Sequence, residues 1–207
     1  MIVAVVNLKG GSTKTTSAAF IAHVLHESGL QVLGVDADAE NESLLAWSEL
    51  AQFPFPVISL PVRDLHNRLP GIAGDRYDAV VIDTPPMKES RGIVLSAVRL
   101  ADHVVVPMAP TAMEYERLPA VRQLLEDAGD LRPDGQEPPT SVLFTRTVPN
   151  ASSTQVYRES IRADGYNVLP GEVRRLESFA QAFGSPIVNA SATAYGDAVA
   201  SILGVTA

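Results

Sequence analysis

The stretch Asn7-Leu8-Lys9-Gly10-Gly11-Ser12-Thr13-Lys14-Thr15-Thr16 decides the fold of this chain. It follows a continuous apolar run of strand length, residues 2–7. It precedes residues 15–28, where apolar side chains recur near helical spacing. A glycine-bearing loop between a buried strand and a helix is the setting of a phosphate-binding loop. The sequence therefore predicts an anion cradle made of backbone N–H groups and the positive end of a helix.

The residue types in this loop suit a nucleotide. Lys14 is placed to reach the β- and γ-phosphates, the Thr15 hydroxyl to bind Mg²⁺, and the Thr16 hydroxyl to donate to the α-phosphate. The candidate nucleotide-binding residues are Gly10, Gly11, Ser12, Thr13, Lys14, Thr15 and Thr16. The alternative is a plain turn with two solvated lysines, because Leu8 and Thr13 stand where the regular pattern G-x-x-x-x-G-K-[ST] has glycines.

Strand and helix patterns alternate along most of the remaining sequence. We expect further strands at 31–35, 56–60, 79–82, 103–108, 141–145 and 167–169. We expect further helices at 41–50, 64–72, 94–100, 114–128, 154–163, 174–183 and 193–203, with Pro119 kinking the fourth of these or marking its start. This alternation predicts an α/β fold: a single P-loop NTPase domain over residues 1–207, with a mostly parallel twisted sheet and helices on both faces.

Composition excludes several classes of protein. The chain has 207 residues and no cysteine, which excludes disulfide scaffolds, thiol catalysis and iron–sulfur clusters. No apolar run reaches the roughly 18 residues of a membrane-spanning helix, and the N-terminus lacks the basic region of a signal peptide. We therefore expect a cytoplasmic protein. The net charge of −8 means that any contact with DNA needs a local basic patch.

Acidic residues follow two of the predicted strands. Asp83 ends the apolar run 79–82, as a magnesium-binding aspartate of a P-loop protein would. Asp36 and Asp38 follow the strand 31–35, where they can support the metal site and orient an attacking water. The alternatives are a turn cap for Asp83 and a helix N-cap for either of the other two.

The motif Lys-Gly-Gly-x-x-Lys-Thr-Thr resembles the deviant Walker A loop of the ParA/MinD family of ATPases, in which the extra lysine, here Lys9, is the signature. The segment Asp36-Ala37-Asp38 is similar to the Asp-x-Asp segment of that family. The resemblance is greatest to the short plasmid-partition ParA proteins that lack an N-terminal helix-turn-helix. The sequence departs from the family pattern at Thr13, Ala39 and Glu40, where glycine, proline and glutamine are usual.

The resemblance implies a function. An ATPase of this kind binds ATP or ADP with Mg²⁺, held here by Thr15, Asp36 and Asp83, and its catalytic residues would be Lys9, Lys14 and Asp38. ATP would join two copies into a homodimer, with Lys9 reaching the partner's nucleotide. The dimer would bind nonspecific DNA, and a ParB-like centromere-binding protein would stimulate hydrolysis. Plasmid or chromosome segregation on the nucleoid, away from membranes, would follow.

Two further groups of residues complete the expected site. By the same resemblance, Thr145, Arg146 and Pro186 would contact the adenine base, although a plain turn explains residues 184–186 equally well. The DNA surface is sought among arginines: Arg158, Arg162, Arg174 and Arg175. Arg158 and Arg162 share a helix face by their spacing of four. The alternative is that these arginines pair with Glu159, Glu172 and Glu177.

Two other functions remain open within or near this fold. One is a positioning ATPase for a protein cargo, or a MinD-like membrane switch. The membrane switch is disfavoured because residues 195–204 carry no cation. The other is a metabolic P-loop ligase or small-molecule kinase, because a few such enzymes share this type of loop. Trp47 is expected to pack behind the loop that follows Asp38, and His23 and His26 lack a third ligand for zinc.

Overall fold

A parallel β-sheet forms the centre of the computed structural model, which describes residues 1–11, 13–175 and 181–205. Its strands lie in the order β3-β2-β4-β1-β5-β6-β7, and β8 pairs with β6. Every pairing among the described strands is parallel. The strands are β1 (Ile2–Val5), β2 (Val32–Asp36), β3 (Val57–Ser59), β4 (Ala79–Asp83), β5 (His103–Met108), β6 (Thr140–Thr147), β7 (Asn167–Val168) and β8 (Val173–Arg174).

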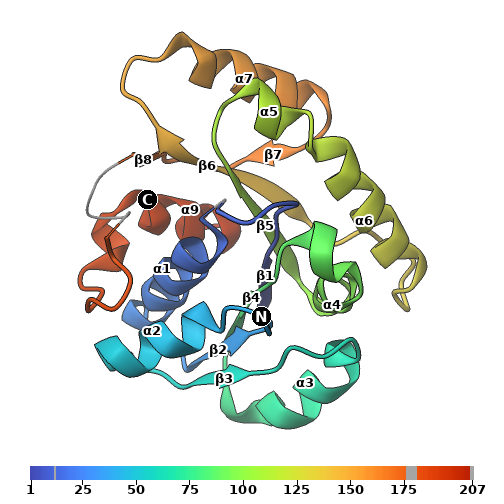
Figure 1. The fold of residues 1–207 in the computed structure, drawn as a ribbon, viewed down its shortest axis with the longest axis vertical. Coiled ribbons are helices and arrows are strands. Elements are labelled where there is room, and N and C mark those ends of the chain that lie inside the picture. The colour runs from blue at the N-terminus through green and yellow to red at the C-terminus, as the bar shows by residue number, and fades with distance from the viewer. Residues whose placement is uncertain (12, 176–180, 206–207) are drawn as a thin grey trace.

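Helices cover both faces of this sheet (Figure 1). One layer holds α1 (Lys14–Glu27), α2 (Ser43–Ala51) and α9 (Ala194–Ile202), and the other holds α3 (Leu65–Ala73), α4 (Met87–Leu100) and α6 (Leu118–Asp130). The short α5 (Ala112–Tyr115) and α7 (Ser152–Ala163) lie beside each other beyond the end of β5. The chain is therefore a three-layer α/β fold with helices on both faces of the sheet, as the sequence predicts.

The alternation of side chains along the central strands builds both layers. Val3 and Val5 are buried in the apolar cluster with α1, α2 and α9, whereas Ala4 and Val6 are buried in the cluster with α3, α4 and α6. A strand buried on both faces needs an apolar residue at every position, which explains the continuous apolar run at the N-terminus.

The strand order places the carboxyl end of β1 at the topological switch point. Strand β1 lies between β4 and β5. The helix that follows β1, α1, covers one face of the sheet, whereas α3 and α4, which lead into β4 and β5, cover the other face. In open parallel sheets, ligands bind beyond the carboxyl ends of the strands at this point. The loop quoted above, residues 7–16, follows β1 directly.

Several predicted elements differ from those observed. The expected helix 114–128 is two helices, α5 and α6, and Pro119 stands in the first turn of α6. Helix α4 begins at Met87, earlier than predicted, and its backbone departs from helical geometry at Ser90. The prediction that a helix begins at Arg174 is wrong, because this residue lies in β8; residues 176–180 of that prediction lie outside the described residues.

Candidate nucleotide-binding site

The loop after β1 is fixed at its base by contacts to two neighbouring segments. The side chain of Asn7 donates to the Pro107 carbonyl at 2.6 Å. The backbone N–H groups of Met87 and Lys88 donate to the carbonyls of Asn7 and Leu8. These contacts join the loop to β5 and to the start of α4. They therefore fix the start of the loop, which carries the glycines and threonines, at the edge of the sheet.

Lys14 is the first residue of α1 and is buried beneath the loop. Its ammonium group donates to the Lys9 carbonyl at 3.3 Å. Burial lowers the pKa of Lys14, and the carboxylates of Asp83 and Asp38 oppose that shift. Within the described part of the loop this carbonyl is the hydrogen-bond partner of the ammonium group, and burying the cation costs solvation energy that an anion at the mouth of the loop would offset. The position of Lys14 therefore favours an anionic ligand.

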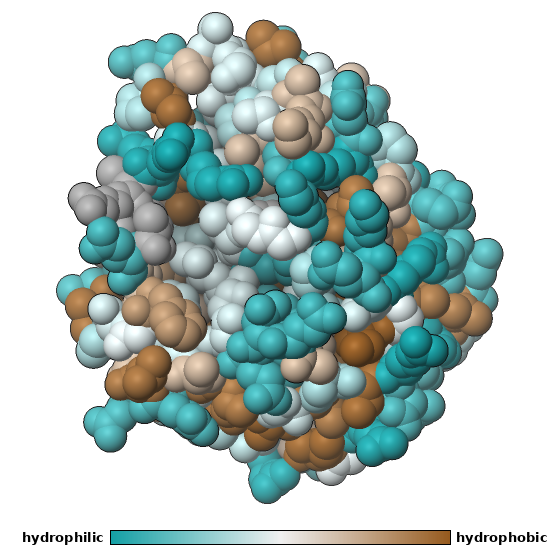
Figure 2. Space-filling model, in the orientation of Figure 1, coloured by the Kyte–Doolittle hydropathy of each residue, from teal (hydrophilic) through white to brown (hydrophobic). Residues whose placement is uncertain are grey.

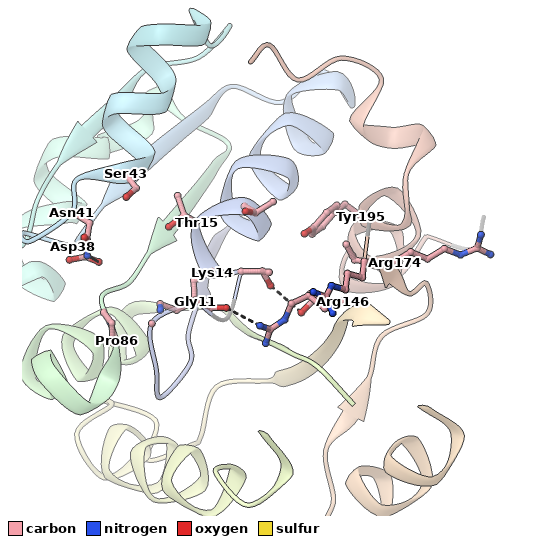
Figure 3. A pocket seen from close by; sticks show the side chains of 16 residues that line it. Gly11, Lys14, Thr15, Asp38, Asn41, Ser43, Pro86, Arg146, Arg174 and Tyr195 are labelled. Carbon is pink, nitrogen blue, oxygen red and sulfur yellow. Dashed lines mark hydrogen bonds between the residues drawn. The ribbon is translucent and has the colours of Figure 1, made fainter. Parts of the chain in front are cut away.

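A cavity of about 680 Å³ opens beside the loop, large enough for a nucleotide. Figure 3 shows Thr15, Asp38, Asn41 and Ser43 on one side of Lys14 and Arg146 and Tyr195 on the other. The lining residues are Gly10, Gly11, Thr13, Lys14, Thr15, Thr16, Asp38, Asn41, Ser43, Pro86, Thr145, Arg146, Val173, Arg174, Arg175 and Tyr195. The structure thus brings together most of the predicted nucleotide-binding residues. Ser12 lies outside the described residues.

Asp83 lies at the carboxyl end of β4, fully buried next to the start of α1. The hydroxyl of Thr15 donates to its carboxylate, yet burial raises the pKa of Asp83 to about 7. Among the described residues, its Oδ1 atom is buried without a hydrogen-bond partner. An orphaned carboxylate oxygen beside a threonine hydroxyl matches the hard oxygen ligands that Mg²⁺ takes. These two residues fit a magnesium ion.

The described residues contain no group of three or more His, Asp or Glu side chains arranged to hold a metal. Mg²⁺ in nucleotide sites takes one or two protein ligands and completes its shell with water and phosphate oxygens. His23 is placed as a packing residue. His23 is buried, its Nδ1 lies 2.8 Å from the Ala19 carbonyl, and its ring packs against Phe53 and Phe55.

Asp36 has a structural task in this fold. Its Oδ2 accepts the backbone N–H groups of Leu44 and Leu45 at 2.8 and 3.0 Å, and its Oδ1 accepts that of Asp38 at 3.0 Å. The carboxylate therefore caps the first turn of α2 from a distance and fixes the loop between β2 and α2. The helix-capping alternative raised by the sequence is thus present, and a role of Asp36 in metal binding stays a prediction.

Asp38 lies in the cavity wall. Its Oδ1 accepts the Glu40 N–H at 3.1 Å, and its Oδ2 accepts the side-chain N–H of Asn41 at 3.1 Å. Asn41 and Ser43 also line the cavity, and no motif in the sequence marks them. The loop thus places a half-exposed carboxylate near Lys14, the position that an acid acting on water beside the phosphates requires. Its catalytic role remains a prediction.

Thr13 adopts a backbone conformation that suits glycine. Its φ of 67° and ψ of 21° lie in the left-handed region, where a β-branched residue is strained. Its hydroxyl donates to Thr145 Oγ1 at 3.0 Å, which links the loop to the end of β6. The threonine at the usual glycine position therefore keeps the backbone shape of the loop and adds a contact to a strand about 130 residues away in sequence.

We expect Thr13→Gly to be more stable than Thr13→Ala by about 1 kcal/mol, the reverse of the usual order of these residues. Both variants lose the bond to Thr145, so the difference reports only the left-handed backbone. Urea unfolding of the two proteins without ligand measures it. An alanine variant as stable as the glycine variant would show that the left-handed conformation carries no strain.

The lysine and the proline predicted at the two ends of the site lie outside the cavity lining. Lys9 is exposed, and it does not line the cavity of its own chain. Pro186 is also exposed and does not line the cavity. Its neighbour Ser185 accepts the indole N–H of the buried Trp47 at 2.9 Å, so this segment packs against α2. The prediction that Trp47 is a packing residue is confirmed.

The four arginines predicted to bind DNA have different surroundings. Arg158 pairs with Glu172 at 2.9 Å, covers the ring of Phe144, and its side chain is only 14% exposed. This is the pairing alternative that the sequence left open. Arg162, Arg174 and Arg175 are exposed, and the guanidinium group of Arg174 points away from the loop (Figure 3). The structure therefore leaves three of the four available to an external anion.

Figure 2 shows, in the orientation of Figure 1, hydrophilic (teal) side chains around a centre of intermediate hydropathy (white).

Over the residues described, none of the helices combines the length and apolar character needed to cross a bilayer.

Comparisons with known proteins agree with the site. A family model described as "CobQ/CobB/MinD/ParA nucleotide binding domain" matches residues 3–187. The maintenance of carboxysome distribution protein A of Halothiobacillus neapolitanus is 29% identical over 176 residues, which cover 83% of this chain and 78% of that protein.

Solved structures of similar fold contain nucleotides. McdA of Cyanothece in complex with ATP has a TM-score of 0.75 at 18% identity, over 100% of this chain and 97% of that one. A putative plasmid partition protein of Borrelia burgdorferi B31 bound to AMPPNP has a TM-score of 0.73 at 18% identity, over 98% of both chains. At these identities the likeness establishes the fold.

Proposed function

The chain belongs to the CobQ/CobB/MinD/ParA nucleotide-binding family, and we propose that it is an ATPase whose ATP-bound dimer binds nonspecific DNA and segregates plasmid or chromosome DNA. The observation that carries the proposal is the arrangement beyond the end of β1: a glycine loop with a buried lysine, Lys14, and a buried, partly orphaned carboxylate, Asp83, close enough to interact. Among the residues that the structure describes, the Lys14 ammonium and the Asp83 carboxylate lack a full set of partners, which the phosphates and the Mg²⁺ of a bound nucleotide would supply.

The roles of the residues follow from their positions. The loop backbone and Lys14 bind the phosphates, and Thr16 adds a donor. Thr15 and Asp83 would hold Mg²⁺, which would supply positive charge to the phosphates. Asp38, in the cavity wall near Lys14, orients the attacking water. Arg146 lies on the side of the cavity opposite Asp38 (Figure 3), where the nucleoside would lie, and Thr145 also lines the cavity.

The proposed dimer depends on Lys9. Its exposed position outside its own cavity suits a lysine that reaches the nucleotide of a second copy and stabilises charge there, as an arginine finger does. Nucleotide sandwiched between two copies would then make dimerisation depend on ATP. A dimer also doubles any basic surface. Arg162, Arg174 and Arg175 could contact DNA phosphates in this way, despite the net charge of −8.

A second candidate function has its own support. The relative from Halothiobacillus neapolitanus is a carboxysome distribution protein, which indicates a protein cargo in place of a plasmid. The nucleotide site and the dimer would be the same in both cases. The two functions differ in the partner that stimulates hydrolysis: a centromere-binding protein for DNA cargo, or an adaptor on a protein assembly.

Steady-state ATP hydrolysis tests the proposal. We expect a slow rate with Mg²⁺ alone and a rate at least severalfold higher when nonspecific duplex DNA and a ParB-like centromere-binding protein are both present. Raising the salt concentration should abolish the DNA effect steeply. A rate that responds to a small-molecule acceptor and ignores DNA and partner would identify a metabolic ligase or kinase instead. Stimulation by a partner bound to an assembly without centromere DNA would favour the second candidate.

A further inference from the structure

A cluster of three charged side chains lies behind the loop that binds the nucleotide. Arg146 follows Thr145 in β6, at an irregularity in the pairing with β8, and its φ of 54° is left-handed. Its Nη1 donates to the Gly11 carbonyl at 3.1 Å, and Figure 3 shows the guanidinium turned toward the loop. A strained backbone that aims a side chain at a binding loop indicates a functional constraint.

Glu114 holds this arginine from the other side. Its side chain, on α5, is only 11% exposed, and its Oε1 lies 3.6 Å from Arg146 Nη2. The same oxygen accepts from Arg117 Nη1 at 2.7 Å. Arg117 thereby fixes the carboxylate between two arginines. The chain of contacts runs from the start of α6 through α5 to the backbone of the nucleotide loop.

The clamped carbonyl belongs to Gly11, whose φ of 72° is left-handed. Glycine has more backbone freedom than any other residue, so its carbonyl oxygen can turn toward a bound anion, and repel it, at little steric cost. A hydrogen bond from a cation outside the loop prevents that rotation.

Resting on the proposed nucleotide binding, we propose that Glu114 is a positioning residue for the nucleotide. It holds the Arg146 guanidinium on the Gly11 carbonyl, and Arg146 in turn keeps the loop in the shape that binds phosphate. Among the described residues, Arg146 Nε and Glu114 Oε2 are both buried without partners. The ion pair between Arg146 and Glu114 therefore keeps one unpaired donor and one unpaired acceptor, so it is not a fully hydrogen-bonded, rigid bridge.

Titration calorimetry with MgADP tests this inference, because ADP separates binding from hydrolysis and from ATP-dependent dimerisation. Glu114→Gln keeps the shape of the side chain and removes its charge, and we expect ADP binding to weaken roughly three- to tenfold, the worth of one positioned hydrogen bond. The matched control is Glu116→Gln, an exposed residue two positions along the chain with the same change of charge. It should bind ADP as the unaltered protein does.

The combination with Arg146→Met distinguishes positioning from general damage. If Glu114 acts through Arg146, the double variant binds ADP no more weakly than Arg146→Met alone. Normal ADP binding by Glu114→Gln, or losses that multiply in the double variant, would overturn the inference. Failure of the unaltered protein to bind any nucleotide would instead overturn the proposed function.

A second variant keeps the test valid if Glu114→Gln does not fold. Arg146→Lys retains the charge but lacks the planar fork that reaches Gly11 and Glu114 together. We expect it to bind ADP as weakly as Arg146→Met. Binding equal to that of the unaltered protein would show that a positive charge suffices, and the positioning role of Glu114 would be refuted.

Discussion

Lys14→Met is expected to lower the affinity for MgATP and MgADP at least about 100-fold, because Lys14 is the buried cation beneath the phosphate site and charge-assisted hydrogen bonds are the strong ones. The same change should leave the ligand-free protein as stable or more stable, by about 1 kcal/mol, because a partly desolvated ammonium is replaced by an apolar chain of similar length. Binding and stability would thus change in opposite directions.

Calorimetric titration and urea unfolding measure these two effects. The matched control is Lys88→Met, which removes an exposed lysine next to the start of α4 and should change neither quantity. If Lys14→Met bound nucleotide normally, the loop would not be the phosphate site. If it lost binding only because it unfolded, the lysine would be structural.

Asp83→Asn is expected to reduce magnesium-dependent ATP hydrolysis at least about 100-fold, since an amide is a weak ligand for Mg²⁺ and carries no charge. It also has a signature in the metal-free protein. The folded pKa of Asp83 is raised from 3.8 to about 7, so the folded state binds more protons than the unfolded state between these values. The unfolding free energy of the unaltered protein therefore falls as the pH rises through this range, and the asparagine variant lacks that component.

Urea unfolding at pH 5 and pH 8 without Mg²⁺ checks the sign. The stability of Asp83→Asn relative to the unaltered protein should increase by roughly 2–3 kcal/mol between the two pH values, at about 1.4 kcal/mol per pH unit. A constant difference would mean that Asp83 is ionised and satisfied in the folded protein. In that case the orphaned oxygen would not mark a metal site.

Sequence alone predicts the half of the site that is local in the chain. The apolar run 2–7, the glycine loop and the helix from Lys14 are adjacent in sequence, so their pattern specifies both the fold and the phosphate cradle. Asp83 was equally visible, because an acid at the end of a fully apolar strand must lie at the same edge of a parallel sheet.

The other half of the site depends on contacts between distant segments. Tyr195 reaches the cavity from α9, and its hydroxyl oxygen lies 3.3 Å from Ser17 Oγ. The two residues are 178 positions apart, so no local sequence pattern marks the tyrosine as part of the site. Strand β8 has only two residues, too few for any periodicity, so the sequence pattern predicts a helix at Arg174 instead. The pairing of Arg158 with Glu172 depends on how α7 packs, so the sequence does not distinguish it from a DNA-binding arginine.

Sedimentation velocity with a slowly hydrolysed ATP analogue and Mg²⁺ measures whether ATP joins two copies of the chain. The proposed function predicts a species of twice the 22.0 kDa chain mass with the analogue, and a single chain with ADP or without nucleotide. Lys9→Ala should still bind the analogue but lose hydrolysis linked to the dimer. A chain that binds the analogue yet sediments at 22.0 kDa in every state would contradict the account.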